Sequence, residues 1–333
     1  MDHLSPLLIA VLFAGLAFDF VNGFHDAANA IATIVATRVL TPRQAVAWAA
    51  FFNITALFVF GTGVAATVGS GLVDLTYVTP QVVLSGLIGA TLWGLMTWRL
   101  GLPSSSSHAL LGGYAGAAMA GSVAHTGWGA AFAPILWAGW IKVTLFIVLA
   151  PVMGLGLAFF LMSLHERYAI LRAHEPVYRR IQLLSSAFLS LMHGGNDAQK
   201  TAGIIASALT SGGVFASFHV PFWVLGISYT TIGLGTLLGG WRIVRTLGHR
   251  LTHLTPAGGV CAEGSAALAL LGATLAGLPV STTHVTTGAI LGVGAASQPR
   301  RVKWHIGRRI AWAWLITIPA SALVGAGISL LLQ

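Results

Sequence analysis

The sequence predicts an all-α polytopic membrane protein built from two inverted-topology repeats. Of its 333 residues, 56% are hydrophobic and only 8% are charged, whereas about a quarter of an average soluble domain is charged. The mean hydropathy is +0.83. Two polar motifs each occur twice in the same order, and their Asp and His residues lie 82 residues apart in the first half and 87 in the second. This pattern indicates an internal duplication of about 170 residues, far longer than the period of a solenoid.

The apolar runs predict ten membrane segments, each near the ~20 residues that a helix needs to cross a bilayer. They cover residues 7–36, 44–68, 80–98, 103–122, 131–164, 181–206, 218–240, 256–277, 279–297 and 310–332. Five segments fall in a first repeat, 1–164, and five in a second, 181–333, with a short linker at 165–180. The fourth and ninth segments are short and glycine-rich, so a full span and a re-entrant hairpin both stay open for them.

The basic residues predict the topology. With the N-terminus outside, 15 of the 17 Lys and Arg residues face the cytoplasm, Arg99 among them, and the other two, Lys142 and Lys200, lie inside spans. The positive-inside rule therefore predicts a protein of the cell (inner) membrane with both termini outside and a cytoplasmic linker. Because five is an odd number, the second half enters the membrane from the opposite side, as in the inverted repeats of secondary transporters.

The first doubled motif reads Asn22-Gly23-Phe24-His25-Asp26-Ala27-Ala28-Asn29 and, in the second half, His193-Gly194-Gly195-Asn196-Asp197-Ala198-Gln199-Lys200-Thr201. A charge inside a membrane costs about 3 kcal/mol or more, so an intramembrane Asp predicts a functional site. Gly and Asn predict helices interrupted at these motifs. The candidates for binding a coupling cation or proton are Asn22, His25, Asp26, Asn29, Asn196, Asp197, Lys200 and Glu263. A sodium ion would be held by Asp26, Asn29 and Asp197; for a lone Asn, a hydrogen bond between helices is the competing interpretation.

The second doubled motif reads Pro103-Ser104-Ser105-Ser106-Ser107-His108 and Pro279-Val280-Ser281-Thr282-Thr283-His284. Proline suits the first turn of a helix, and hydroxyls beside the free N–H groups of a helix N-terminus can hold an oxyanion. Capping of the helix by a single hydroxyl is the alternative. The candidate phosphate ligands are Ser105, Ser106, Ser107, His108, Ser281, Thr282, Thr283 and His284.

At these motifs the chain resembles the inorganic phosphate transporter (PiT) family, of the bacterial low-affinity phosphate permease type. The family motif is similar to Gly-Ala-Asn-Asp-Val-Ala-Asn, once per half. Residues 23–29 match it with His25 in place of the first Asn, and residues 194–200 match it with Lys200 in place of the last Asn. The resemblance implies symport of inorganic phosphate driven by protons or sodium, with phosphate near the Ser/Thr-His motifs and the cation near the aspartates. Family members that resemble sulfate permeases leave sulfate as an alternative anion, and a metal-phosphate complex is a further form of the substrate.

Lys200 predicts proton coupling rather than sodium coupling. It stands where the first repeat has Asn29, and its ammonium near Asp197 supplies the positive charge that a second sodium ion would bring. Two like charges at low dielectric repel strongly. Sodium coupling stays the alternative, because one intact site could exist around Asp26.

Other function classes fit the sequence less well. An intramembrane phosphatase would need a basic pocket for a diphosphate, but the spans hold no Arg, so we expect a transporter and not an enzyme. The basic residues are scattered in short clusters, which disfavours nucleic-acid binding despite a net charge of +9. A single cysteine, Cys261, excludes an intramolecular disulfide and a multi-Cys metal site. The expected partners are phosphate, the lipid bilayer and a second copy of the chain in a homodimer, with no cofactor.

Overall fold

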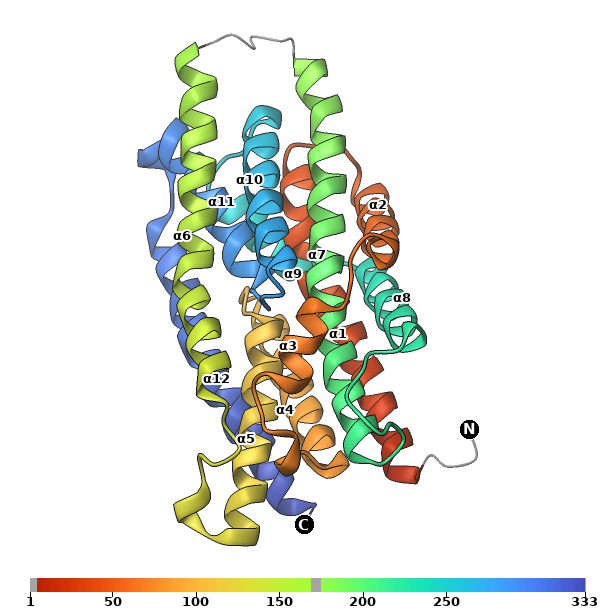
Figure 1. The fold of residues 1–333 in the computed structure, drawn as a ribbon. Coiled ribbons are helices and arrows are strands. Elements are labelled where there is room, and N and C mark those ends of the chain that lie inside the picture. The colour runs from red at the N-terminus through yellow and green to blue at the C-terminus, as the bar shows by residue number, and fades with distance from the viewer. Residues whose placement is uncertain (1–4, 169–174, 333) are drawn as a thin grey trace.

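The computed structural model describes residues 5–168 and 175–332, and it confirms the all-α class (Figure 1). Val73 and Ile135 form an isolated bridge, and no sheet occurs among the described residues. The described α-helices are α1 (Pro6–Ala36), α2 (Pro42–Thr55), α3 (Gly63–Ser70), α4 (Pro80–Leu100), α5 (Ser106–Thr126), α6 (Trp137–Tyr168), α7 (Glu175–Ser211), α8 (Phe222–Leu238), α9 (Trp241–Arg245), α10 (Pro256–Leu275), α11 (Thr282–Ser297) and α12 (Trp304–Leu331).

The order of elements is the same in both halves. Each half begins with a long helix (α1, α7) and continues with a bent pair, α2–α3 at 84° and α8–α9 at 60°. A hairpin follows (α4–α5, α10–α11), and a long helix with an internal proline ends the half: Pro151 in α6 and Pro319 in α12. By length and composition five helices could cross a membrane, or up to seven if each bent pair counts as one span.

The two hairpins enter the molecule from opposite ends. The start of α4 and the end of α5 lie beside the C-terminus, where Gln81, His125 and Leu332 line one cavity (Figure 1). The start of α10 lies at the other end, where Pro256 and Arg38 line another. The turns of the hairpins meet inside the protein. The structure thus has returning hairpins for 103–122 and 279–297, one of the two arrangements that the sequence left open.

The position of Arg99 differs from the predicted cytoplasmic loop. Arg99 is not in a loop at the end of the molecule; it lies near the turn of the first hairpin, where Arg242 Nη1 donates to its backbone oxygen over 2.5 Å. The start of α1 and the end of α12 lie at the same end, and the end of α6 and the start of α7 lie at the other (Figure 1). The predicted linker 165–180 is helical up to Tyr168 and again from Glu175, and residues 169–174 of it lie outside the described residues.

The expected helix interruptions at the Asp motifs are wrong, because α1 and α7 run through both motifs as continuous helices. The glycines there serve close helix contact instead. A Cβ on Gly23 would collide with the backbone oxygen of Ile232 in α8, and a Cβ on Gly194 would collide with the backbone of Asn53 in α2. The bends lie in the α2–α3 and α8–α9 pairs.

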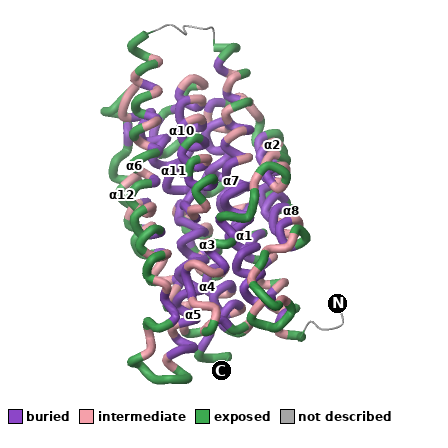
Figure 2. The backbone as a smooth tube through the Cα atoms, in the orientation of Figure 1, coloured by how far each residue is buried: buried purple, intermediate pink, exposed green. Residues whose placement is uncertain are grey.

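The halves interlock rather than stand side by side. The hairpin helix α5 packs along α12, and α11 packs along α6, so each hairpin is held by the last helix of the other repeat. Small residues make this possible: a Cβ on Gly288 in α11 would collide with the Pro151 carbonyl in α6. The centre of the bundle is buried, whereas the outer faces of α6 and α12 are exposed (Figure 2). Exposed α6 residues such as Leu145, Val152 and Phe160 form the kind of apolar surface that a bilayer covers.

Candidate functional site

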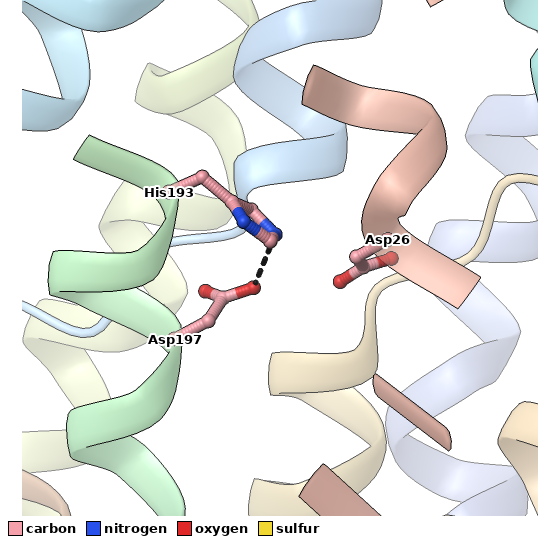
Figure 3. A group of neighbouring side chains, drawn as sticks. All are labelled: Asp26, His193 and Asp197. Carbon is pink, nitrogen blue, oxygen red and sulfur yellow. Dashed lines mark ion pairs between the residues drawn. The ribbon is translucent and has the colours of Figure 1, made fainter. Parts of the chain in front are cut away.

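The two Asp motifs lie next to each other at the centre of the bundle. Asp26 in α1 faces Asp197 and His193 in α7, and one ligand atom from each of the three lies within 4.8 Å of the others (Figure 3). All three side chains are buried. Since Asp26 and Asp197 come from equivalent helices of the two repeats, the site lies on the interface between the repeats, where inverted-repeat transporters bind their substrates and ions.

Asp26 contacts one side chain from the first repeat and one from the second. Its Oδ1 lies 2.8 Å from His25 Nδ1 and accepts a hydrogen bond from Thr283 Oγ1 over 3.4 Å. On its other side, His25 Nε2 faces the Thr97 hydroxyl at 3.3 Å and the Ser104 hydroxyl at 3.5 Å. These contacts join the first Asp motif to the end of α4 and the turn that follows it.

Asp197 is held by two basic side chains. Lys200 Nζ donates to its Oδ1 over 2.6 Å, and His193 Nε2 lies 3.2 Å from its Oδ2. Lys200 is only 1% exposed and also donates to Ser107 Oγ over 2.5 Å and to the backbone oxygen of Val280 over 2.7 Å. The ammonium therefore ties the second Asp motif to both hairpin turns. Charges this deep in a protein require such partners.

Most hydroxyls of the Ser/Thr-His motifs fall into two groups, whereas Ser106 is buried in the first turn of α5 and belongs to neither. Ser105 Oγ and Ser281 Oγ each accept from the backbone N–H three residues on, over 3.2 and 3.3 Å, so both are helix caps. Ser107, Thr282 and Thr283 instead contact residues of the Asp motifs.

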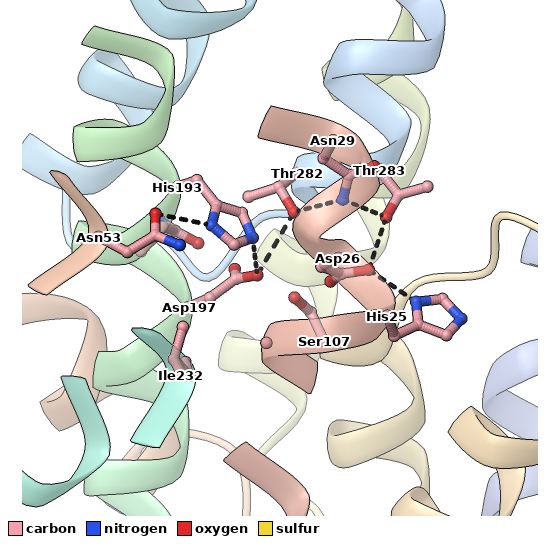
Figure 4. A network of polar contacts seen from close by, with 12 residues as sticks. His25, Asp26, Asn29, Asn53, Ser107, His193, Asp197, Ile232, Thr282 and Thr283 are labelled. Atoms are coloured by element: carbon pink, nitrogen blue, oxygen red, sulfur yellow. Dashed lines mark hydrogen bonds and ion pairs between the residues drawn. The ribbon is translucent and has the colours of Figure 1, made fainter. Parts of the chain in front are cut away.

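Asn29 connects α1 to the second hairpin through this group. Its Nδ2 donates to Thr282 Oγ1 over 3.2 Å and to Thr283 Oγ1 over 2.8 Å (Figure 4). The first-turn N–H groups of α5 and α11 lie beside these hydroxyls, and such groups have no helical acceptor. Together with the Lys200 ammonium, this arrangement can hold a tetrahedral oxyanion.

His108 and His284 contact each other rather than the aspartates. Their rings are edge-to-face with centroids 4.6 Å apart. His284 also stacks on Trp314 of α12 at 3.9 Å, and its Nδ1 lies 3.4 Å from the Ile147 carbonyl. The two imidazoles therefore pack the hairpins together behind the hydroxyl groups.

The remaining predicted residues lie around this centre. Asn196 Nδ2 donates to Thr274 Oγ1 over 3.0 Å and to the Leu278 carbonyl over 3.1 Å, which fixes the turn of the second hairpin. Asn22 is buried in α1, and its Oδ1 has no hydrogen-bond partner among the described residues.

Glu263 in α10 belongs to a separate polar cluster. Its carboxylate accepts hydrogen bonds from Thr33 over 2.6 Å, Gln182 over 2.9 Å and Ser185 over 2.5 Å. These donors come from α1 and α7, so Glu263 connects three helices. None of these hydrogen bonds reaches the two aspartates.

His193 and Asn53 also contact the site, although neither was among the predicted site residues. His193 lies four residues before Asp197 and so on the same helical face, a signal that the motif itself contained. Asn53 of α2 has its Oδ1 3.2 Å from His193 Nδ1 and donates to Thr236 Oγ1 over 3.0 Å. Only its polarity within an apolar segment could have drawn attention to it.

Comparisons with known proteins agree with this arrangement. The model of the phosphate transporter family matches the chain twice, over residues 22–176 and 166–325. A probable low-affinity inorganic phosphate transporter of Rhizobium meliloti (strain 1021) is 50% identical over 325 residues, which cover 96% of this chain and 95% of the relative. Another probable low-affinity inorganic phosphate transporter, of Bacillus subtilis (strain 168), is 42% identical over 333 residues, which cover 98% of this chain and 97% of that relative. A solved structure titled "The sodium-dependent phosphate transporter" superposes with a TM-score of 0.85 at 27% identity and covers 98% of this chain and 99% of its own.

Proposed function

Because the chain belongs to the phosphate transporter family, we propose that it imports inorganic phosphate by symport with protons. It is a multi-pass membrane transporter of phosphate and not an enzyme. The proposal concerns the direction of transport, the coupling ion and the residues that bind each species.

One observation carries the proposed phosphate site: the first turns of α5 and α11 meet beside the Lys200 ammonium. Ser107 contacts Lys200, and Thr282 and Thr283 contact Asn29. The hydroxyls of Ser106, Ser107, Thr282 and Thr283, with the first-turn amides, provide donors from both repeats. Lys200 provides the balancing positive charge. The helix caps Ser105 and Ser281 would shape the turns, and His108 and His284 would hold them together.

The Lys200–Asp197 contact supplies a physical reason for proton coupling. Lys200 bonds to Asp197 over 2.6 Å and to Ser107 over 2.5 Å. A phosphate bound at Ser107 would compete with Asp197 for the ammonium. A buried carboxylate that loses its cationic partner is costly unless it takes up a proton. Binding of phosphate would thereby favour protonation of Asp197, and His25 and His193 lie close enough to exchange protons with the two aspartates.

Sodium coupling is the second candidate. Asp26, His193 and Asp197 bring ligand atoms within 4.8 Å of one another, a grouping that could hold a metal ion. Asn29 Oδ1 is buried without a hydrogen-bond partner among the described residues, so an oxygen ligand is available there. The solved relative is titled a sodium-dependent transporter. Against sodium stands Lys200, whose charge already neutralises one of the two carboxylates.

Uptake into proteoliposomes with separated gradients tests the proposal. An inward proton gradient without sodium should drive accumulation of labelled phosphate, and a sodium gradient at clamped pH and membrane potential should not. The reverse result would replace the proton by sodium. Competition with arsenate and sulfate tests the anion, since sulfate should not compete. Uptake with and without Mg²⁺ tests whether a metal-phosphate complex is carried.

The proposal includes an orientation and an assembly. The termini lie outside the cell membrane and the α6–α7 connection lies in the cytoplasm, with the repeats 1–164 and 181–333 forming the two halves of a protomer within a homodimer. In a Cys261→Ser background, a cysteine at Trp128 should react with an impermeant thiol reagent on intact cells and one at Glu175 should not. Light scattering in detergent, corrected for bound detergent, should give twice the mass of the chain; a monomer mass would remove the dimer from the proposal.

A further inference from the structure

Asp19 lies outside the centre described above and has no role in it. It lies in α1, seven residues before Asp26, which places it about 10 Å away along the helix, toward the end at which α1 begins. Its side chain is 0% exposed, and its two carboxyl oxygens lack hydrogen bonds of normal geometry to any described residue.

Two hydroxyl groups from other helices face this carboxyl. Thr201 of α7 and Ser228 of α8 interact with Asp19, and both are 0% exposed. Neither hydroxyl oxygen is placed within hydrogen-bonding geometry of a described partner. One carboxyl group and two hydroxyl groups from three helices therefore face one another in the buried interior, and none of their oxygens has another hydrogen-bond partner among the described residues.

No positive charge balances Asp19 among the groups that act on it. The charged group facing it from the described part of α7 is Asp197, one turn from Thr201, which repels a second negative charge. A buried ionised carboxylate without a partner is strongly disfavoured. The carboxyl is therefore stable only when it carries a proton or another cation.

The helices pack closely one turn before and one turn after Asp19, which disfavours a hydrated metal ion there. A Cβ on Gly15 would lie 2.8 Å from the Ile205 side chain, and one on Gly23 would collide with the Ile232 carbonyl. A proton needs no such room. Hydroxyl groups can both accept and donate a hydrogen bond, so Thr201, which faces Asp19 and follows Asp197 by one turn on the same face of α7, is a group able to pass a proton.

We propose that Asp19, Thr201 and Ser228 form a second proton-binding site, through which the coupling proton passes between Asp197 and the end of the molecule at which α1 begins. This inference rests on the proposed proton symport and adds to it a proton-binding site separate from the two central aspartates. Asp19 does not touch phosphate; it binds the transported proton, and Thr201 positions and relays it.

The test compares net transport with exchange in proteoliposomes. Asp19→Asn keeps the size of the side chain and removes the titratable group. It should lower pH-gradient-driven accumulation at least about tenfold, whereas exchange of internal for external phosphate at equal pH should change by less than about twofold. Asp74→Asn, in the loop before α4, is the matched control and should leave both rates unchanged.

Each outcome bears on the proposal. Wild-type protein that transports phosphate without using a pH gradient would refute the proposed proton symport before Asp19 is considered. With wild-type coupling intact, full accumulation by the Asp19→Asn variant would overturn the second site, and so would loss of exchange, because Asp19 would then belong to the phosphate site or to the fold. If that variant is not inserted, Thr201→Val takes its place: it should slow accumulation and spare exchange, and unchanged accumulation overturns the relay.

Discussion

Lys200 in α7 donates a hydrogen bond to Ser107 in α5, and this contact joins the second Asp motif to the first hairpin over 2.5 Å. The same relationship occurs in the other repeat, where Asn29 in α1 donates to Thr283 in α11 over 2.8 Å. Asn29 and Lys200 occupy the same place in the two Asp motifs. In each case, the Asp motif of one repeat therefore donates a hydrogen bond to a hairpin hydroxyl of the other repeat. The donor is a neutral amide in α1 and a charged ammonium in α7.

The two aspartates should respond differently to neutralisation. Asp26→Asn and Asp197→Asn should both reduce phosphate uptake to background, because both remove a charge and a proton acceptor. Asp197→Asn should also destabilise the protein by about 3–5 kcal/mol, since it leaves Lys200 buried without its ionic partner. Asp26→Asn leaves no buried ammonium without its ionic partner, so its effect on stability should be smaller.

Membrane insertion, thermal unfolding in detergent and uptake measured on the same preparations would check this difference. Near-normal uptake by either variant would remove that residue from the coupling site. Equal loss of stability in both would show that Lys200 does not depend on Asp197.

The hairpin hydroxyls should separate into ligands and caps. Replacing Ser107 or Thr283 with Ala removes a donor to a charged acceptor, which costs about 1.5–3 kcal/mol and should weaken phosphate binding roughly 10- to 150-fold. Ser105→Ala and Ser281→Ala remove helix caps, which cost about 1 kcal/mol of stability, and should alter affinity less. Isothermal titration with phosphate in detergent distinguishes the two groups, and a larger loss of affinity from the cap variants would contradict the assignment.

Close packing of the hairpins should make their glycines intolerant of side chains. Gly288→Ala places a methyl group against the Pro151 carbonyl in α6, and overpacking of this kind costs about 1–3 kcal/mol. Gly156 in α6 has open space where a Cβ would lie, so Gly156→Ala is the control and should not lower the melting temperature. Matching melting temperatures for the two variants would mean that α6 and α11 can move apart.

The sequence predicted the parts of this molecule that depend on composition and repetition. Doubled motifs such as those at Asp26 and Asp197 revealed the duplication, and the all-α class followed from apolar runs. The packing role of Gly23 within a continuous α1 could not be predicted, because the Ile232 backbone that it contacts lies about 200 residues away in the chain. The role of His284 was equally hidden, since its stacking on Trp314 is a tertiary contact that leaves no local pattern.

Lys200 should decide which cation the protein uses. Lys200→Asn gives the second Asp motif the residue that the first has at Asn29, and it removes the ammonium that balances Asp197. The amide oxygen of the new Asn then replaces the Lys200 ammonium beside the carboxylates of Asp26 and Asp197, so a sodium ion should bind there. We expect phosphate uptake by this variant to lose its response to a proton gradient and to gain one to a sodium gradient. Lys142→Asn, on the exposed face of α6, is the control and should keep the wild-type response.

Thermal unfolding provides an independent measurement of the same change. A ligand that binds only the folded protein stabilises it by RT ln(1 + [L]/Kd), about 2.7 kcal/mol at a hundredfold excess over Kd. Sodium chloride should therefore raise the melting temperature of the Lys200→Asn variant relative to choline chloride, with no such difference in the wild type. A sodium-dependent rise already present in the wild type would show that a metal ion binds despite Lys200, and the protein would then be sodium-coupled through the group of Asp26, His193 and Asp197.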